Sequence, residues 1–212
     1  MFADRFEAGR RLAEQLTEMG PWPGAVVLGI PRGGVVVAAE VARVLRLPLD
    51  VLVAAKVSSP SNPEFAIGAV APDGEVLVNA EAGFSGSEVR ALSGPALAKV
   101  HRSLEVFRAE GAPHDLTRGA AIIVDDGLAT GLTALAAVEY ARRCEATMVV
   151  LAVPVASSGA AALLDPHVDR LVVAEVPTQF SAVGQFYARF GQTEDAEVVA
   201  LLAEAATRTT ST

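Results

Sequence analysis

Short β-branched apolar runs alternate with helix-like segments along most of this 212-residue chain, and this alternation constrains the fold more than any other feature. Each run has the length of a buried strand, and the segments between them carry apolar residues at helical spacing. Strands and helices in alternation form a mainly parallel sheet with helices on both faces. The sequence therefore predicts a doubly wound α/β fold, in one domain over residues 1–212.

The expected strands cover residues 25–30, 49–57, 120–124, 146–155 and 168–176. The expected helices cover residues 2–19, 35–46, 95–110, 132–144 and 158–164. The apolar side of the first helix is expected to contain Phe2, Phe6, Leu12, Leu16 and Met19. That of the 95–110 helix is expected to contain Leu97, Val100, Leu104 and Phe107. Functional residues of such a sheet belong in the loops at the carboxyl ends of its strands.

Two stretches depart from the alternation. Residues 58–64, SSPSNPE, are polar and rich in Ser and Pro, and the runs FAIGAV and EVLVN that follow flank the turn sequence APDG. This pattern predicts a flexible β arm over residues 58–79 with two short strands. Residues 207–212, TRTTST, are small and polar and predict a frayed tail.

Composition and charge narrow the class of protein. No window approaches 18 consecutive apolar residues, so we expect no transmembrane helix and no membrane partner. The charged N-terminal segment does not resemble a signal peptide, and the one cysteine, Cys144, excludes an internal disulfide. We therefore expect a cytoplasmic location. The net charge of -8 and the pI near 4.9 argue against a broad nucleic-acid-binding surface.

The stretch IIVDDGLATGLT, residues 122–133, ends an apolar run in two adjacent aspartates. In one interpretation, one aspartate caps the next helix and the other is simply solvated. The small residues that follow favour a second interpretation, because several backbone N–H groups and two threonine hydroxyls can converge on one anion at the start of a helix. Carboxylates accept hydrogen bonds from vicinal hydroxyls. The whole motif therefore fits a ribose phosphate.

Other phosphate-binding or catalytic motifs do not match. The chain has no G-x-x-x-x-G-K-[ST] loop, and GIPRGG is not the dinucleotide fingerprint G-x-G-x-x-G. The two aspartates are adjacent and at mid-chain, whereas a phosphatase with an aspartate nucleophile needs them one residue apart near the start of its domain. The nucleophile elbow G-x-S-x-G of serine hydrolases is also missing.

The aspartate motif resembles the signature of type I phosphoribosyltransferases. PRGG, residues 31–34, is similar to the pyrophosphate loop of that family and precedes the motif in the family's order. The ordered set GIPRGGV, AAKVSSPSNPEFAIGAV, VDDGLATGLT, AVPVAS and FYARFGQTEDAEV resembles a bacterial subgroup of phosphoribosyltransferases. The resemblance implies the type I fold, in which a flexible arm and a small variable hood accompany the parallel sheet.

The resemblance also implies a donor, phosphoribosyl pyrophosphate, with Mg²⁺ as cofactor. Asp125 and Asp126 would bind the ribose hydroxyls and contact the metal indirectly, since the donor's own oxygens and water would hold it. The 5-phosphate would be held by Ala129, Thr130, Gly131, Leu132 through its N–H, and Thr133, and Gly127 would also belong to the substrate-binding loop. The pyrophosphate would face Arg32, Gly33 and Gly34, and Pro31 would belong to the same substrate-binding loop, with a non-proline cis peptide at Pro31–Arg32.

The expected catalytic residues are Arg32, Lys56 and Asp126. Lys56 ends the expected strand 49–57, at the same sheet edge as both loops, where the family often has a basic residue near the pyrophosphate. A lysine at a strand end can also simply extend its ammonium group to water. The nucleophile would attack the anomeric carbon as pyrophosphate departs, without a covalent enzyme intermediate. The 58–79 arm would close over the site.

The acceptor cannot be assigned from the sequence. The arm, the 95–110 helix and residues 177–190 are candidate parts of the hood, where Phe180, Phe186 or Tyr187 would stack on a base or pack in the core. Two functions remain open: a transferase acting on a nucleobase or other small nucleophile, and a non-catalytic nucleotide-binding regulator with the same fold. A homo-oligomer is compatible with either.

Overall fold

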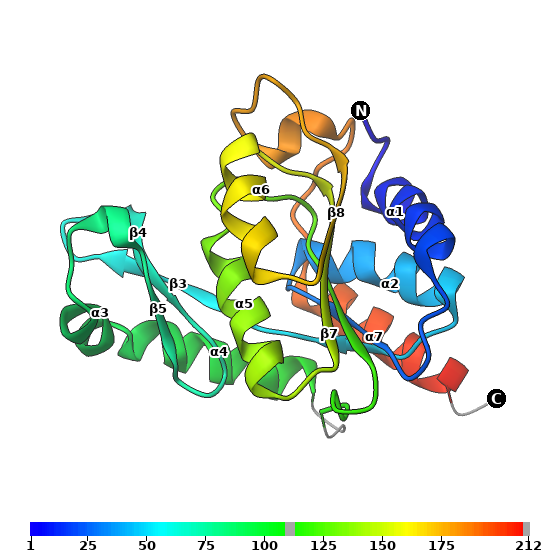
Figure 1. Cartoon of the computed structure of the whole chain (residues 1–212), viewed down its shortest axis with the longest axis horizontal. Helices are drawn as coiled ribbons and strands as arrows, with labels where there is room; N and C mark the ends of the chain where they lie inside the picture. The colour runs from blue at the N-terminus through cyan, green and yellow to red at the C-terminus, as the bar shows by residue number, and fades with distance from the viewer. Residues whose placement is uncertain (109–112, 210–212) are drawn as a thin grey trace.

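A parallel sheet forms the centre of the molecule (Figure 1). The computed structural model describes residues 1–108 and 113–209, and within these residues five strands pair in the order β2-β1-β6-β7-β8. Their bounds are Leu49–Val51 (β2), Val26–Gly29 (β1), Ala120–Val124 (β6), Met148–Val155 (β7) and Arg170–Glu175 (β8). All neighbouring pairs are parallel, so the predicted α/β sheet is confirmed.

Helices cover both faces of this sheet (Figure 1). One face packs against α1 (Arg5–Met19), α2 (Gly33–Leu45) and α7 (Asp195–Thr209), and the other against α5 (Leu132–Arg143) and α6 (Ser158–Leu164). Because side chains alternate along a strand, Ile122 and Val124 face the first group while Ala121 and Ile123 face the second. Burial on both faces explains why the three inner strands, β1, β6 and β7, are apolar throughout.

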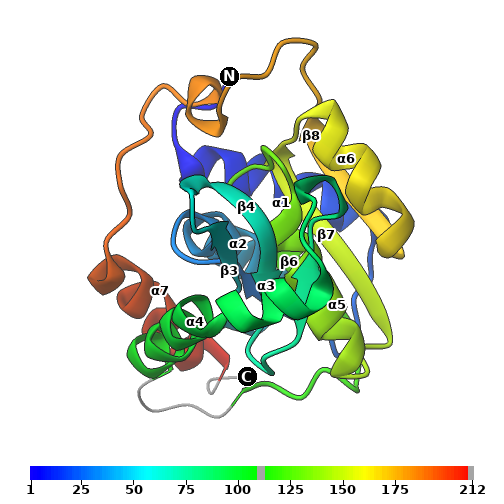
Figure 2. The ribbon, with the colours of Figure 1, turned by 90° about the vertical axis from the view of Figure 1, so that its left-hand side faces the viewer.

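A second sheet carries the predicted arm. Its antiparallel strands β3 (Ala55–Ser59), β4 (Asn62–Val70) and β5 (Val76–Val78) pair in that order. The sheet packs with α3 (Gly86–Leu92) and α4 (Gly94–Phe107), and α4 in turn lies beside α7 (Figure 2). The two strands predicted around the APDG turn are therefore confirmed.

The face predicted for the 95–110 helix is also confirmed. Val100 and Phe107 of α4 are buried, and Leu97 and Leu104 pack partly buried against the same cluster, which includes Val198 of α7. Arg108 follows the helix, and residues 109 and 110 of the predicted span lie outside the described residues. This cluster joins the second sheet to the body of the molecule.

The strand predicted over 49–57 is wrong as a single element. Its first part is β2, and the N–H of Leu52 still donates to the carbonyl of Gly29 at 3.0 Å. The chain then leaves the central sheet, and Lys56 lies on β3, opposite Ala69 of β4. An apolar run has the same pattern in either sheet, so periodicity could not separate the two strands.

The predicted start and face of the first helix are partly wrong. Asp4 caps α1, because its carboxylate accepts a 3.0 Å hydrogen bond from the N–H of Glu7. Phe2 therefore precedes the helix and is buried beside Tyr187. Phe6 is 38% exposed, since at about 100° per residue it lies opposite the buried line through Ala8 and Leu12.

Several short or C-terminal elements complete the structure. The 3₁₀ turns are η1 (Ala80–Ala82), η2 (Asp165–His167) and η3 (Val183–Phe186). Helix α7 was not predicted; residues 207–209 of the expected tail belong to it, and residues 210–212 lie outside the described residues. None of the helices within the described residues is long and apolar enough to cross a membrane.

Candidate active site

The two loops singled out by the sequence lie side by side at the carboxyl edge of the central sheet. They follow β1 and β6, which are neighbouring strands, and the N–H of Ile30 donates to the carbonyl of Val124 at 2.9 Å. The Pro31–Arg32 peptide is cis, as the resemblance implies. Because the strands are adjacent, residues about 90 positions apart in sequence share one site.

Glycines allow these loops to touch. A Cβ added at Gly33 would overlap the Asp126 carboxylate oxygen Oδ2, and one added at Gly34 would lie 2.9 Å from the Cα of Asp125. Distances below 3.0 Å are not tolerated for a real Cβ, so neither position accepts a side chain without movement of the acid pair. The 31–34 loop and the aspartates are thus in direct contact.

The aspartate pair is half-buried, and the side chain of Asp126 is 17% exposed. The N–H of Asp126 donates to Oδ1 of Asp125 at 2.8 Å. Burial, and then the charge of Asp126, raise the pKa of Asp125 well above its usual value. Burial also raises the pKa of Asp126, although the guanidinium of Arg5 opposes this effect. The pair is therefore a partly buried acidic site at the end of β6, whose carboxyls hold their protons more tightly than free ones do.

Neither aspartate caps the next helix. The N-cap of α5 is Gly131, whose left-handed φ of 78° suits glycine. Within the described residues, no side chain caps this helix. Thr130 is exposed and Thr133 is partly exposed at the start of this helix. The first N–H groups of α5 therefore have the arrangement that binds anions.

The loop before α5 is tied to the next strand. The N–H of Leu128 donates to the carbonyl of Val155, and the N–H of Ser157 donates to the carbonyl of Leu128, both at 2.9 Å. The hydroxyl of Ser157 donates to the carbonyl of Ala129 at 2.7 Å and accepts from the N–H of Ala160 at 3.0 Å. Ser157 thus supports the small-residue loop and caps α6 at once.

Sequence reasoning missed Arg5 as a site residue, and it considered Tyr187 only for the hood or the core, yet both residues contact Asp126. Arg5, at the start of α1, donates from Nε to Oδ2 of Asp126 at 2.8 Å. Tyr187 donates from its hydroxyl to the backbone carbonyl of Asp126 at 2.6 Å. These contacts join positions 121 and 61 residues apart, so no local motif could have indicated them.

The aromatic residues of the 177–190 segment pack mainly with one another. Tyr187 is 5% exposed, and its ring lies 5.5 Å from that of Phe2 and 5.0 Å from that of Phe190. Phe180 and Phe186 lie 5.3 Å apart. For Tyr187 the structure favours core packing over stacking on a base.

The two predicted basic residues have different surroundings. Arg32 follows the cis peptide, and its Nη1 lies 3.7 Å from Oδ1 of Asp195 at the start of α7, with both side chains largely exposed. Lys56 is exposed on β3 and does not end a strand of the central sheet, which corrects its expected position. Its role at the pyrophosphate stays a prediction.

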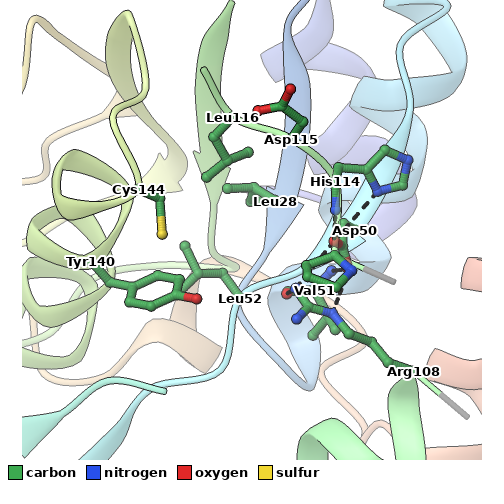
Figure 3. Close-up of a pocket in the computed structure, with 11 residues that line it drawn as sticks. Leu28, Asp50, Val51, Leu52, Arg108, His114, Asp115, Leu116, Tyr140 and Cys144 are labelled. Carbon is green, nitrogen blue, oxygen red and sulfur yellow. Dashed lines mark hydrogen bonds and ion pairs between the residues drawn. The ribbon is translucent and has the colours of Figure 1, made fainter. Parts of the chain in front are cut away.

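A separate cavity of about 310 Å³ lies beside β2, the C-terminal half of α5 and residues 113–116 (Figure 3). Tyr140 of α5 and Cys144, which directly follows this helix, point into it. Asp50, 6% exposed, accepts two hydrogen bonds from Arg108, at 3.0 and 3.1 Å, and one from the N–H of His114 at 3.1 Å. The cavity is not lined by the described residues of the 31–34 or 125–133 loops, and Asp50 is fully partnered.

Comparisons with known proteins identify the family of the chain. A family model described as the phosphoribosyl transferase domain matches residues 3–188. Two Mycobacterium tuberculosis proteins, named "Putative phosphoribosyl transferase MT0597" and "Putative phosphoribosyl transferase Rv0571c", are each 43% identical over 206 residues, covering 95% of this chain and 46% of the relative. The chain thus spans about half the length of these curated relatives.

A solved structure is also similar over nearly the whole chain. It is the crystal structure of TT1426 from Thermus thermophilus, with a TM-score of 0.84 and 39% sequence identity, and the match covers 96% of this chain and 98% of that one. The chain therefore belongs to the phosphoribosyl transferase family.

Proposed function

We propose that this chain binds phosphoribosyl pyrophosphate with Mg²⁺ and transfers the phosphoribosyl group to a nucleobase or another small nucleophile, releasing pyrophosphate. The observation that carries the proposal is the contact between Gly33 and Asp126, because it brings a pyrophosphate-type loop against a ribose-phosphate motif. This chain covers 46% of each Mycobacterium tuberculosis relative. The activity of a protein of that full length is therefore also only proposed.

Each part of the donor has a matching group at the site. The ribose hydroxyls donate to the carboxylates of Asp125 and Asp126, and the 5-phosphate accepts from the first N–H groups of α5. The pyrophosphate lies against Arg32 and the backbone N–H groups of Gly33 and Gly34. The residues of the two loops thereby align the C1–O bond for attack.

The acid pair also suits the reaction. As the nucleophile forms a bond to C1, the C1–O bond breaks and pyrophosphate leaves with the electron pair, so positive charge develops on the ribose ring. Buried carboxylates of fixed position stabilise such a charge more than water does, since the local dielectric is low. The acceptor gives up its proton to water or to an oxygen of the departing pyrophosphate.

The residues of the site fit a Mg²⁺ ion that is held mainly by the oxygens of phosphoribosyl pyrophosphate. Among the described residues no group of three or more His, Cys, Asp or Glu side chains is arranged to bind a metal, whereas Asp125 and Asp126 offer hard oxygen atoms at the ribose end. Mg²⁺, when bound, offsets the charge of the departing pyrophosphate. The two aspartates would orient it through the donor and water.

Calorimetric titration with Mg²⁺ and phosphoribosyl pyrophosphate tests donor binding, and pyrophosphate release with a panel of bases tests transfer. The double variant Asp125→Asn/Asp126→Asn should lose donor affinity and stay folded. The matched control Asp115→Asn/Asp165→Asn removes two exposed acids and should bind as the wild type does. Donor binding without any reactive acceptor would favour the regulator, and a wild type that binds no phosphoribosyl pyrophosphate would exclude the transferase.

A further inference from the structure

We propose that Arg5 is a positioning residue of the donor site. Its guanidinium holds the carboxylate of Asp126 against the 31–34 loop and supplies a counter-charge that lets the acid pair stand beside an anionic donor. This inference rests on the proposed function. It adds to the site a residue of the first helix that belongs to neither loop.

The guanidinium of Arg5 is held by three groups. Nε donates to Oδ2 of Asp126 at 2.8 Å, and Nη1 donates to the carbonyl of Gly191 at 2.9 Å. Its Cζ lies 3.9 Å from the ring centroid of Phe190, which is the distance of a cation–π contact. The side chain is 12% exposed, whereas that of Arg11 on the same helix is 47% exposed. A group held this way keeps one orientation.

The ion pair lies where the two loops meet. A Cβ added at Gly33 would overlap Oδ2 of Asp126 and would lie 2.7 Å from Nε of Arg5. Gly33 is one of the residues expected to face the pyrophosphate, and Asp126 is expected to bind the ribose. Arg5 is therefore adjacent to both halves of the donor site.

The position of Arg5 in its helix argues for a role outside the helix. Arg5 is the first residue of α1, and the N-terminus of a helix carries partial positive charge, which disfavours a cation there. The cap is already supplied by Asp4. A residue that contradicts local helix preference is expected where function requires it.

The functional reason for a cation at this position is electrostatic. Two adjacent carboxylates repel a ligand that carries several phosphate charges, and the repulsion is strong where water is excluded. A cation in hydrogen-bond contact with one carboxylate offsets this repulsion and leaves the other carboxylate oxygens to accept from ribose hydroxyls. Arg5 thereby makes an acidic ribose site compatible with an anionic donor.

The test is donor affinity in a double-mutant cycle on the full chain. Calorimetric Kd values for Mg²⁺ with phosphoribosyl pyrophosphate are measured for the wild type, Arg5→Gln, Asp126→Asn and the double variant. We expect Arg5→Gln to weaken binding about tenfold to hundredfold. In the Asp126→Asn background the same change should have less than about a twofold effect, because Arg5 acts through Asp126.

Matched variants separate this role from a general effect on charge or folding. Arg10→Gln removes the same charge from an exposed position of the same helix and should change Kd less than about twofold. Arg5→Lys restores the charge and should partly restore affinity. Phe190→Leu keeps Arg5 but removes the aromatic ring that the guanidinium lies over, and should weaken donor binding about threefold. If Arg5→Gln does not fold, Phe190→Leu and Arg5→Lys test the role of Arg5 in its place.

Three results would overturn the inference. A wild type that binds no donor would overturn the proposed function together with it. A folded Arg5→Gln variant with wild-type affinity would overturn the role of Arg5 alone. Additive effects of Arg5→Gln and Asp126→Asn would mean that Arg5 contacts the donor directly and does not position Asp126.

Discussion

The hydroxyl of Tyr187 donates a 2.6 Å hydrogen bond to the backbone carbonyl of Asp126, which joins the segment after β8 to the acid pair. The phenol is 5% exposed, and burial, followed by the charge of Asp126, raises its pKa far above the usual value. Tyr187 therefore stays protonated and acts as a donor at any physiological pH. The C-terminal part of the chain thus supports a loop more than 60 residues before it.

Replacing Tyr187 by Phe removes the hydroxyl, so the carbonyl of Asp126 loses this hydrogen bond. We expect the free energy of unfolding to fall by about 1 to 2 kcal/mol and the donor Kd to rise a few-fold, because the acid pair loses part of its support. Denaturant unfolding and calorimetry measure the two effects. Tyr140→Phe is the control: this tyrosine, the other one in the chain, lines the separate cavity, so its loss should leave the donor Kd unchanged.

Gly33→Ala tests the contact between the loops. The new methyl group would overlap Oδ2 of Asp126, so we expect the acid pair to move and the donor Kd to rise about tenfold or more. Thermal unfolding should also occur at a lower temperature. Gly94→Ala is the control, because it places a methyl group where, among the described residues, no atom beyond its chain neighbours and the helix backbone lies within 4 Å. It should neither raise the donor Kd nor lower the unfolding temperature. Equal donor Kd values for the two variants would contradict the close contact.

Ser157→Ala tests the support of the 125–133 loop. It removes both the hydrogen bond to the Ala129 carbonyl and the N-cap of α6, and should lower the free energy of unfolding by about 1 kcal/mol. The donor Kd should rise as well, since the loop loses an anchor. Ser85→Ala removes the N-cap of α3, in a capping box with Glu88, at similar cost in stability. If Ser85→Ala weakened donor binding as much, Ser157 would have no specific role.

Asp125→Asn should make the protein more stable and less able to bind. Burial raises the pKa of Asp125, so the folded state binds its proton more tightly than the unfolded state, and stability falls as pH rises above about 3.8 toward the raised pKa. In metal-free buffer the variant should therefore gain stability at pH 7 and none near pH 3. Its donor Kd should rise about tenfold or more. Unfolding curves across this pH range check the sign.

Asp50→Asn should have the opposite pH dependence. Burial alone would raise the pKa of Asp50, but the hydrogen bond from His114 and the charge of Arg108 outweigh it and lower the pKa below 3.8. The stability contributed by the ionised form is thus complete above about pH 4 and is lost as pH falls through the lowered pKa. At pH 7 the variant should lose about 2 to 3 kcal/mol, and this loss should shrink below pH 4.

The exposed Asp115 provides the control for Asp50. Asp115 pairs with Arg118 three residues away, with both side chains at least half exposed, so Asp115→Asn should leave the free energy of unfolding nearly unchanged. Neither variant should change the donor Kd, because neither residue belongs to the two loops. A donor Kd that rises in Asp50→Asn would connect the separate cavity with the site.

Local sequence was sufficient for most of the elements and for the two loops. The strand predicted over 120–124 and the helix predicted over 158–164 have the observed bounds, because their periodicity and flanking turn residues depend on near neighbours alone. The cis peptide at Pro31–Arg32 followed from the resemblance. The division of residues 49–57 between two sheets could not be predicted, since an apolar run fits either.

By itself, the sequence determined the parallel α/β fold and the residues of the 31–34 and 125–133 loops, because strand length, alternation and small-residue turns are properties of short segments. Only the tertiary structure decided which residues from outside the two loops contact the acid pair. Arg5 and Tyr187 reach Asp126 from the two ends of the chain, because α1 and the segment after β8 pack over the same edge of the sheet. Contacts of that range depend on how whole elements pack, which no local pattern encodes.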